Sequence, residues 1–465
     1  MMRSESRGVG WSRPGLGICL MLCGAAWGSS VLAQTRPAVR TAEQRGRVAP
    51  PPGLWRQSDR RPVVNRAAAE AQGIARFESR RLVLYTDIPR EQAEPLLGLM
   101  DQAYDAWVAL CGELPPDRER TEFQMTGYVM ADQRRFRTAG LLPDSLPSFE
   151  HGRHRGQEFW MNDQGSDYYR AHLLLHEGTH CFTTAVDRDL TRSVWLFEGI
   201  AEYFATHRIS REGHSEFRVW PKERAAFPLL GRIRLLEEHR SRSETLSMVE
   251  VARQSPEGYD QPDAYAWAWA LVYFLAELPE TRESFREIIQ GVVRGESHGP
   301  LDGLLADARR QRLWRWYVAD LCHGYDLTRA LPLEKDFDEG EELGREISIT
   351  ANRGWQGMGV RMKGGRSYRV SAQGRVTLAT QPRDWTSEPA GISIRYHAGL
   401  PLGRLVGRFW PADTGLTEEL ETFSVGSQLV YRPSEDGILF LRVNDFWNEL
   451  DDNSGEYRVS ITLQE

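Results

Sequence analysis

The sequence predicts a multidomain protein in which an α+β domain is followed by an all-β sandwich domain. Two observations lead to this fold class. Up to about residue 330, segments with strand-like alternation come first, and long segments with helical spacing of apolar residues follow. After the acidic segment 331–344 the apolar residues recur with a period of two, and no helical segment remains. The chain of 465 residues is long enough for two or three domains.

The first residues differ in character from the rest of the chain. Three arginines precede the run "LGICLMLCGAAWGSSVLA", which Gly and Ser interrupt and which ends on small residues. This pattern predicts a signal peptide over 1–33 and export to the periplasm, the cell envelope or the outside. A short membrane anchor is the alternative. Residues 34–75 are rich in Arg, Ala and Pro without a sustained period, so we expect a linker or a loosely ordered arm.

Residues 76–330 contain the elements of the α+β domain. Alternation predicts strands in "RRLVLYTD", "TEFQMTGYVM" and "EFWMN", and apolar spacing predicts a long helix in "EQAEPLLGLMDQAYDAWVALCGEL". Further helices are expected at about 168–186, 193–207, 263–277, 281–293 and 301–321.

Residues 345–465 carry the signals of a sandwich. The segments "SYRVSAQ", "VTLATQ", "ISIRYHA", "ILFLRV" and "EYRVSITL" alternate, with turn residues between them. After removal of the first 33 residues only Cys111, Cys181 and Cys322 remain, so at most one disulfide can form. The net charge of −7 argues against a nucleic-acid partner, which normally requires a basic surface.

The segment "HEGTH" has the residue types and spacing of a zinc site. His176 and His180 lie four residues apart on a predicted helix, so both imidazoles can reach one metal ion. Glu177 can take a proton from a water molecule at that ion. Eighteen residues after His180, "WLFEGIAEYFA" offers Glu198 as a third ligand. One turn further, Glu202 can accept a hydrogen bond from the other ring nitrogen of His176.

The alternative for the two acids is a solvated helix face. That alternative leaves their apolar neighbours Trp195, Ile200 and Phe204 unexplained. His172, one turn before His176, is expected to be a buried neighbour of the site, and Cys181 to belong to the core.

The two helices resemble those of the gluzincin metallopeptidases, the clan of thermolysin and the aminopeptidase-N type enzymes. "HEGTH" matches their HExxH, and "WLFEGIAEYF" is similar to their W-L-x-E-G-x-A-x-Y helix. The chain is most similar to a group of secreted bacterial gluzincin-like proteins first catalogued as a domain of unknown function. The resemblance implies a gluzincin-like zinc peptidase domain over 76–330, with His176, His180 and Glu198 as Zn²⁺ ligands and Glu177 as base.

The same resemblance implies further features. The substrate it implies is a peptide or protein. Because Gly and Ser interrupt the apolar run at the start of the chain, no stable membrane span is expected after processing. Tyr265, in "DAYAWAWALVYFLAEL", stands where aminopeptidase-type members place a tyrosine that donates to the oxyanion. Core packing is the alternative for Tyr265, and Tyr259 is the second candidate. "RGQEFWMN" corresponds to the clan's edge strand, to which a peptide adds as a further strand. The glycine-rich exopeptidase signature is absent, so aminopeptidase activity is not implied.

The loop near the C-terminus groups the hard oxygen ligands that calcium prefers. Asp445, Asp452 and Asn453 lie at a strand-loop-strand junction, although such residues also favour plain turns. Their order is similar to the calcium loop of the bacterial galactophilic (LecA-type) lectin sandwich. That resemblance covers about 345–465. It implies Ca²⁺ bound by these three side chains, with the Glu449 carbonyl as a fourth ligand, and a carbohydrate partner.

The sequence as a whole therefore favours an exported zinc-dependent peptidase. The alternative is a catalytically inactive or carbohydrate-binding cell-envelope protein on a peptidase-like scaffold. The intact Glu177 favours the enzyme, because an inactive site does not need the base.

Overall fold

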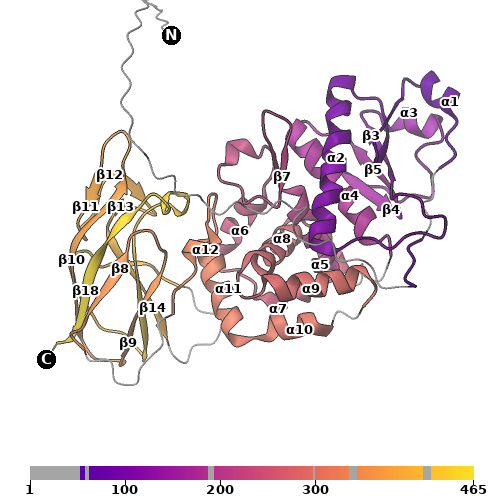
Figure 1. Cartoon of the computed structure of the whole chain (residues 1–465). Coiled ribbons are helices and arrows are strands. Elements are labelled where there is room, and N and C mark those ends of the chain that lie inside the picture. The colour runs from indigo at the N-terminus through magenta and orange to yellow at the C-terminus, as the bar shows by residue number, and fades with distance from the viewer. Residues whose placement is uncertain are drawn as a thin grey trace, which may run out of the picture.

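A computed structural model of the protein describes residues 53–57, 62–186, 193–296, 299–334, 343–411 and 420–464. It consists of a mixed α/β part followed by a C-terminal all-β part, which lie side by side (Figure 1). The predicted signal peptide and residues 335–342 of the acidic segment lie outside the described residues. No helix in the described ranges is both long enough and apolar enough to span a membrane.

A five-stranded sheet forms the first layer of the α/β part, with strand order β1-β2-β3-β5-β4. The strands are β1 (Ala75–Glu78), β2 (Leu82–Thr86), β3 (Met125–Met130), β4 (Gly152–Arg155) and β5 (Glu158–Asn162). The three central strands run parallel, and β1 and β4 pair antiparallel at the two edges. All residues of β2 and β3 are buried, as expected for strands covered on both faces.

The prediction that "RGQEFWMN" forms the edge strand is wrong. Its apolar part is β5, which lies between β3 and β4. The edge is β4, a short polar strand that the sequence did not predict. The chain reverses at Gly156, whose φ of 64° is readily adopted only by glycine, and β4 folds back against β5.

Helices cover both faces of this sheet. On one face, Leu82, Leu84, Met125 and Phe159 pack in one core with α2 (Arg90–Cys111) and α4 (Asp167–Thr183). The other face packs against the short helices α1 (Arg66–Ala71) and α3 (Gln133–Thr138). Because α1 lies within 34–75, the prediction of an aperiodic arm is wrong for 66–71. The Asn65 side chain caps this helix by accepting from the Ala68 N–H.

The remaining helices follow the sheet in sequence and form a bundle beside it. Most predicted helices are present, as α4, α5 (Val194–Ala205), α8 (Pro262–Glu277) and α9 (Arg282–Val293). The single helix expected at 301–321 is instead two, α10 (Gly299–Ala306) and α11 (Ala308–Asp320). They divide at Asp307, whose side chain accepts from the Arg310 N–H and begins α11. Shorter elements complete the part: α6 (Arg232–Ser241), α7 (Met248–Ala252), α12 (Leu327–Ala330), β6 (His207–Ile209) and β7 (Ser215–Phe217).

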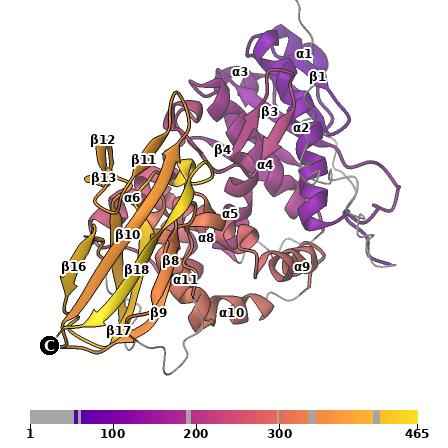
Figure 2. The same ribbon diagram turned by 60° about the vertical axis from the view of Figure 1, so that its left-hand side comes forward.

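The C-terminal part is all-β, as the sequence predicts. One sheet has the order β11-β10-β18-β8, with β16 also paired to β10, and the other has the order β15-β14-β17-β9. Figure 2 shows the long β10 and β18 beside each other. Residues of both sheets form one buried core. The strands are β8 (Glu346–Thr350), β9 (Gln356–Met362), β10 (Tyr368–Ala379), β11 (Trp385–Ser387), β12 (Ile392–His397), β13 (Leu400–Leu402), β14 (Leu405–Pro411), β15 (Phe423–Ser424), β16 (Gln428–Tyr431), β17 (Gly437–Val443) and β18 (Ser454–Leu463).

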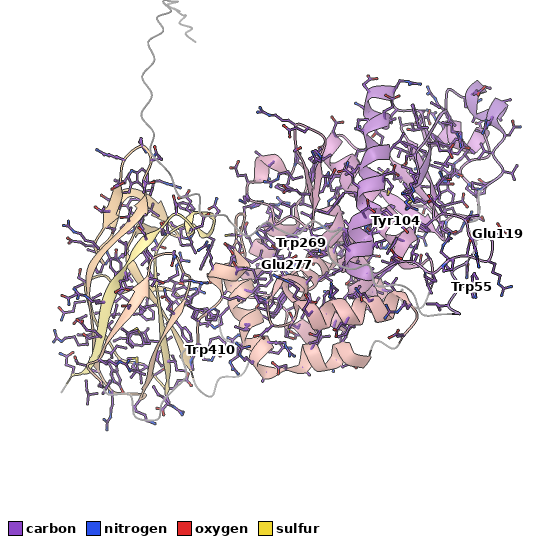
Figure 3. All side chains as sticks on the ribbon, in the orientation of Figure 1. Trp55, Tyr104, Glu119, Trp269, Glu277 and Trp410 are labelled. Carbon is purple, nitrogen blue, oxygen red and sulfur yellow. The ribbon has the colours of Figure 1, made fainter. Side chains whose placement is uncertain are left out.

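The two parts share a buried interface. Trp316 of α11 stacks on Trp410 of β14, with their ring centroids 5.7 Å apart, and Figure 3 shows Trp410 where the two parts meet. At the end of α11, Asp320 accepts from both terminal nitrogens of Arg408 at 2.7 and 2.8 Å and from the Trp355 indole at 2.8 Å. This buried network joins the parts far more closely than the expected linker alone would.

Candidate metal centre

Two neighbouring helices position the candidate ligands. Ser166 caps the start of α4 by accepting from the Tyr169 N–H, and the helix lies buried between the sheet and α5. Helix α5 approaches α8 closely at Gly199, where an added Cβ would lie 2.6 Å from the Ala268 carbonyl oxygen. Helix α5 also packs against α4.

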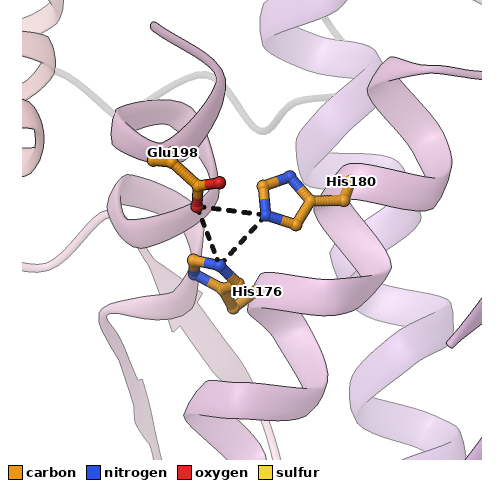
Figure 4. Close-up of side chains that lie close together, drawn as sticks. All are labelled: His176, His180 and Glu198. Atoms are coloured by element: carbon orange, nitrogen blue, oxygen red, sulfur yellow. Dashed lines mark hydrogen bonds and ion pairs between the residues drawn. The ribbon is translucent and has the colours of Figure 1, made fainter. Parts of the chain in front are cut away.

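The structure brings His176, His180 and Glu198 together (Figure 4). The two Nε2 atoms are 3.0 Å apart, and they lie 3.2 and 3.3 Å from Glu198 Oε2. Ligand atoms of a tetrahedral zinc ion, each bound at about 2.0–2.1 Å, are about 3.3 Å apart. The three atoms therefore have nearly the spacing of one face of such a coordination tetrahedron and can hold a metal ion.

The chemistry of these atoms also favours a cation between them. His176 Nδ1 lies 3.1 Å from Glu202 Oε1, and a proton on this nitrogen, facing the carboxylate, leaves the lone pair of Nε2 for a metal ion. Glu198 Oε2 is buried without a hydrogen-bond partner. Lone pairs that face one another at this distance repel unless a proton or a metal ion lies between them. Two imidazoles and one carboxylate are a donor set typical of catalytic zinc.

Glu202 lies behind the ligands, at the centre of a charged cluster. Besides His176, its carboxylate faces His172 Nε2 at 3.3 Å and accepts two hydrogen bonds from Arg232, at 2.8 and 2.9 Å. Although burial raises the pKa of Glu202, the charges of Arg232 and His172 hold it well below its usual value. Burial lowers the pKa of His176, but Glu198 and Glu202 outweigh this effect and raise it to about 10. The surroundings thus stabilise positive charge at the place where a metal ion would bind.

Glu177 faces the edge strand. Burial raises the pKa of its carboxyl group to about 8, and Oε2 has no hydrogen-bond partner. The carboxylate occupies the space that a side chain at Gly152 of β4 would fill, since an added Cβ there would lie 3.0 Å from Cγ and Cδ of Glu177. Glycine at this position is the feature of the site that sequence reasoning missed, together with Arg232.

Both candidate tyrosines lie beside the cluster. The Tyr265 ring is 6.2 Å from the His176 ring, and Tyr259 packs edge-on against Tyr265 at 5.2 Å. The Tyr259 hydroxyl is buried without a partner. Burial and the charge of Glu198 raise the pKa of both phenols, so both stay protonated and able to donate. The structure brings both to the site without choosing between them.

Strand β4 carries backbone groups that face outward next to the ligands. The Asn162 N–H donates to the His151 carbonyl, so in the antiparallel alternation the backbone groups of Gly152 and His154 point away from β5. No strand within the described residues pairs with that outer edge. His154 itself faces α4, with its ring 4.8 Å from the His180 ring. An extended chain could therefore pair with β4 directly beside the three ligands.

The structure brings together two of the three predicted calcium ligands. Asp445 is buried and accepts from the Asn453 side-chain amide at 3.0 Å, and the amide oxygen of Asn453 has no partner. Asp452 is exposed, and none of its described contacts reaches Asp445 or Asn453. The Glu449 side chain forms an ion pair with Arg395.

The comparisons with known proteins give similarity without an activity. The chain matches no curated protein. Among solved structures, it is similar to a lectin described as "EclA N-terminal domain; PllA-like lectin", at 20% identity and a TM-score of 0.21, covering 27% of this chain and 100% of that one. It is also similar to the Aeromonas hydrophila PliG periplasmic inhibitor of g-type lysozyme, at 10% identity and a TM-score of 0.17, covering 29% and 96%. Residues 171–301 are similar to a family described as "Protein of unknown function (DUF1570)", and this match spans all three candidate ligands and Glu177.

Proposed function

We propose that the protein is an exported zinc-dependent peptidase with Glu177 as its catalytic base. The observation that carries this proposal is the convergence of His176 Nε2, His180 Nε2 and Glu198 Oε2 within 3.3 Å of one another, beside a buried carboxylate without a partner. Three protein ligands leave one coordination position for a reactant, which distinguishes catalytic from structural zinc sites. Export rests on the charged and apolar start of the chain.

Each residue then has a separate role. Zinc, when bound, supplies Lewis acidity that polarises the scissile carbonyl and makes water more acidic. Glu177, as the carboxylate, accepts the proton of the attacking water and passes it to the leaving amine. A phenol, of Tyr265 or Tyr259, donates a hydrogen bond to the carbonyl oxygen as negative charge develops on it.

The substrate is held at the edge of the sheet. The outward backbone groups of Gly152 and His154 pair with an extended peptide, which becomes a sixth strand. Because main-chain hydrogen bonds carry this contact, the scissile bond lies beside Glu177 whatever the peptide's side chains are. The outer edge of β4, which no described strand covers, can pair with an extended peptide but not with the surface of a folded protein.

Metal analysis and one conservative variant test the proposal. We expect one zinc ion per chain in the wild type, loss of zinc in His180→Ala, and unchanged zinc in His214→Ala, which alters an exposed histidine. Glu177→Gln keeps the shape of the side chain but cannot accept a proton. It should retain zinc while its hydrolysis of a quenched fluorescent peptide library falls by ~10²–10⁴-fold. Near-wild-type turnover in Glu177→Gln would show that the chemistry lies elsewhere.

For the C-terminal part we propose a calcium site at Asp445 and Asn453, favoured by the buried carboxylate and the amide oxygen without a partner. Because the two parts share a buried interface, the full chain is the material to test. Its melting temperature should rise in millimolar calcium but not in magnesium, and Asp445→Asn should abolish the rise. Equal shifts with both ions would indicate general salt screening instead.

A further inference from the structure

We infer that Arg232 is a positioning residue of the metal centre, which fixes Glu202 and, through it, the orientation of the ligand His176. This inference rests on the proposed zinc site. Arg232 lies on α6, 30 residues from Glu202, and touches none of the three candidate ligands within the contacts described.

The contact between Arg232 and Glu202 is a buried fork. The guanidinium Nε and Nη2 donate to Oε2 and Oε1 at 2.9 and 2.8 Å, and only 12% and 2% of the two side chains is exposed. A bidentate pair fixes both the position and the plane of a carboxylate, which a single ammonium group cannot do.

The fixed carboxylate is shared with the two histidines of α4. Oε1 lies 3.1 Å from His176 Nδ1, and Oε2 lies 3.3 Å from His172 Nε2. Each carboxylate oxygen therefore accepts a hydrogen bond from one guanidinium nitrogen and faces one imidazole nitrogen. The plane of Glu202 sets the rotation of the His176 ring, and with it the direction in which Nε2 points toward the metal position.

Arg232 also contacts α8, the helix that carries Tyr265. Its guanidinium carbon lies 5.4 Å from the centre of the Tyr265 ring, within the range of a cation–π contact. Its Nη1 lies 3.5 Å from the carbonyl oxygen of Pro262, at the start of the same helix. One side chain thus contacts the helix of the candidate tyrosine and the residue that orients a ligand.

Charge explains why an arginine is needed here. Glu202 is buried close to a second carboxylate, Glu198, which also approaches His176. A buried carboxylate without a cationic partner is costly, and removing one member of a buried pair destabilises proteins strongly. Arg232 compensates the charge of Glu202, so that Glu202 can stay in place as an acceptor behind the ligand.

Zinc affinity provides the test, measured on the metal-free full chain by competition with a chelator of known affinity. Arg232→Met should weaken zinc binding by ~10–100-fold, the usual effect of losing an outer partner of a ligand. Arg232→Lys restores the charge without the fork and should recover part of the loss. Arg234→Met is the matched control. Arg234 lies on the same helix with 58% of its side chain exposed, and its Nε is 3.5 Å from Glu238 Oε1. The zinc affinity of Arg234→Met should equal that of the wild type.

A double variant separates this role from simple destabilisation. Arg232→Met combined with Glu202→Gln removes both charges, so the fold is kept, as circular dichroism and melting would verify. If Arg232 acts through Glu202, the double variant should bind zinc no more weakly than Glu202→Gln alone.

Two results would overturn the inference. One is wild-type zinc affinity in a folded Arg232→Met protein. The other is an equal loss from Arg232→Met with and without Glu202→Gln, which would show an effect independent of Glu202. Failure of the wild type to bind zinc would instead overturn the proposed function, so the two failures are distinguishable.

Discussion

Adding one methyl group at Gly152 should impair catalysis while leaving the metal bound. The backbone of Gly152 is not in the left-handed region, so alanine is tolerated there by the main chain. Its Cβ would nevertheless overlap Oε1 of Glu177 and lie 3.0 Å from Cγ and Cδ, tighter than most side-chain contacts. The carboxylate must retreat by about 1 Å, and a displacement of that size in a reacting group costs ~10²-fold in rate, or about 2.7 kcal/mol in the barrier.

The assay compares kcat and KM of Gly152→Ala with those of the wild type on a quenched fluorescent peptide, after zinc has been measured in both. We expect kcat to fall and zinc content to stay at the wild-type level. Gly165→Ala serves as the control, since nothing lies within 4 Å of a Cβ at that glycine. An unchanged kcat in zinc-loaded Gly152→Ala would refute the assignment of Glu177 as a base held against β4.

Three further predictions concern other parts of the molecule. Arg408→Met leaves Asp320 buried without its cation, so the unfolding free energy should fall by about 3–5 kcal/mol. The control Arg375→Met removes an exposed ion pair and should lower it by less than about 1 kcal/mol, and urea titration measures both variants. Tyr265→Phe should lower kcat by ~10²–10³-fold with zinc retained if its phenol is the oxyanion donor, and an unchanged kcat would assign that role elsewhere. Burial raises the pKa of Asp445 to about 6, above the usual 3.8, so the protonated form favours folding. In chelator, its contribution is full below pH 4 and is lost as the pH rises through 6, a change of about 3 kcal/mol that Asp445→Asn should remove from urea titrations.

The sequence by itself determined the local structure of the candidate site. The apolar spacing around His176 and Glu198 predicted helices at the places where α4 and α5 occur. Within a helix, residues four apart share a face whatever the rest of the chain does, so the two histidines had to point the same way. Alternation likewise predicted the all-β C-terminal part, because a period of two is a property of the strand itself.

Only the tertiary structure decided which residues surround that site. Gly152 and Arg232 carry no local signal, since one lies in a short polar strand and the other in a polar helix. Their roles arise from the pairing of β4 with β5, from the packing of α6 against α8, and from the contact of Arg232 with Glu202 of α5. Both depend on contacts between residues far apart in the chain, which no periodicity encodes.

The same reason explains the error about the edge strand. The apolar segment containing Trp160 looked like an edge only because the short strand before it, β4, was not recognised. The acidic segment lies between the α/β part and the all-β part, yet the two parts share one buried core. The Arg408 guanidinium of β14 lies 5.5 Å from the centre of the Trp316 ring of α11. Burial is shared between segments distant in sequence, so the fold as a whole, rather than any one segment, determines where the core of this protein ends.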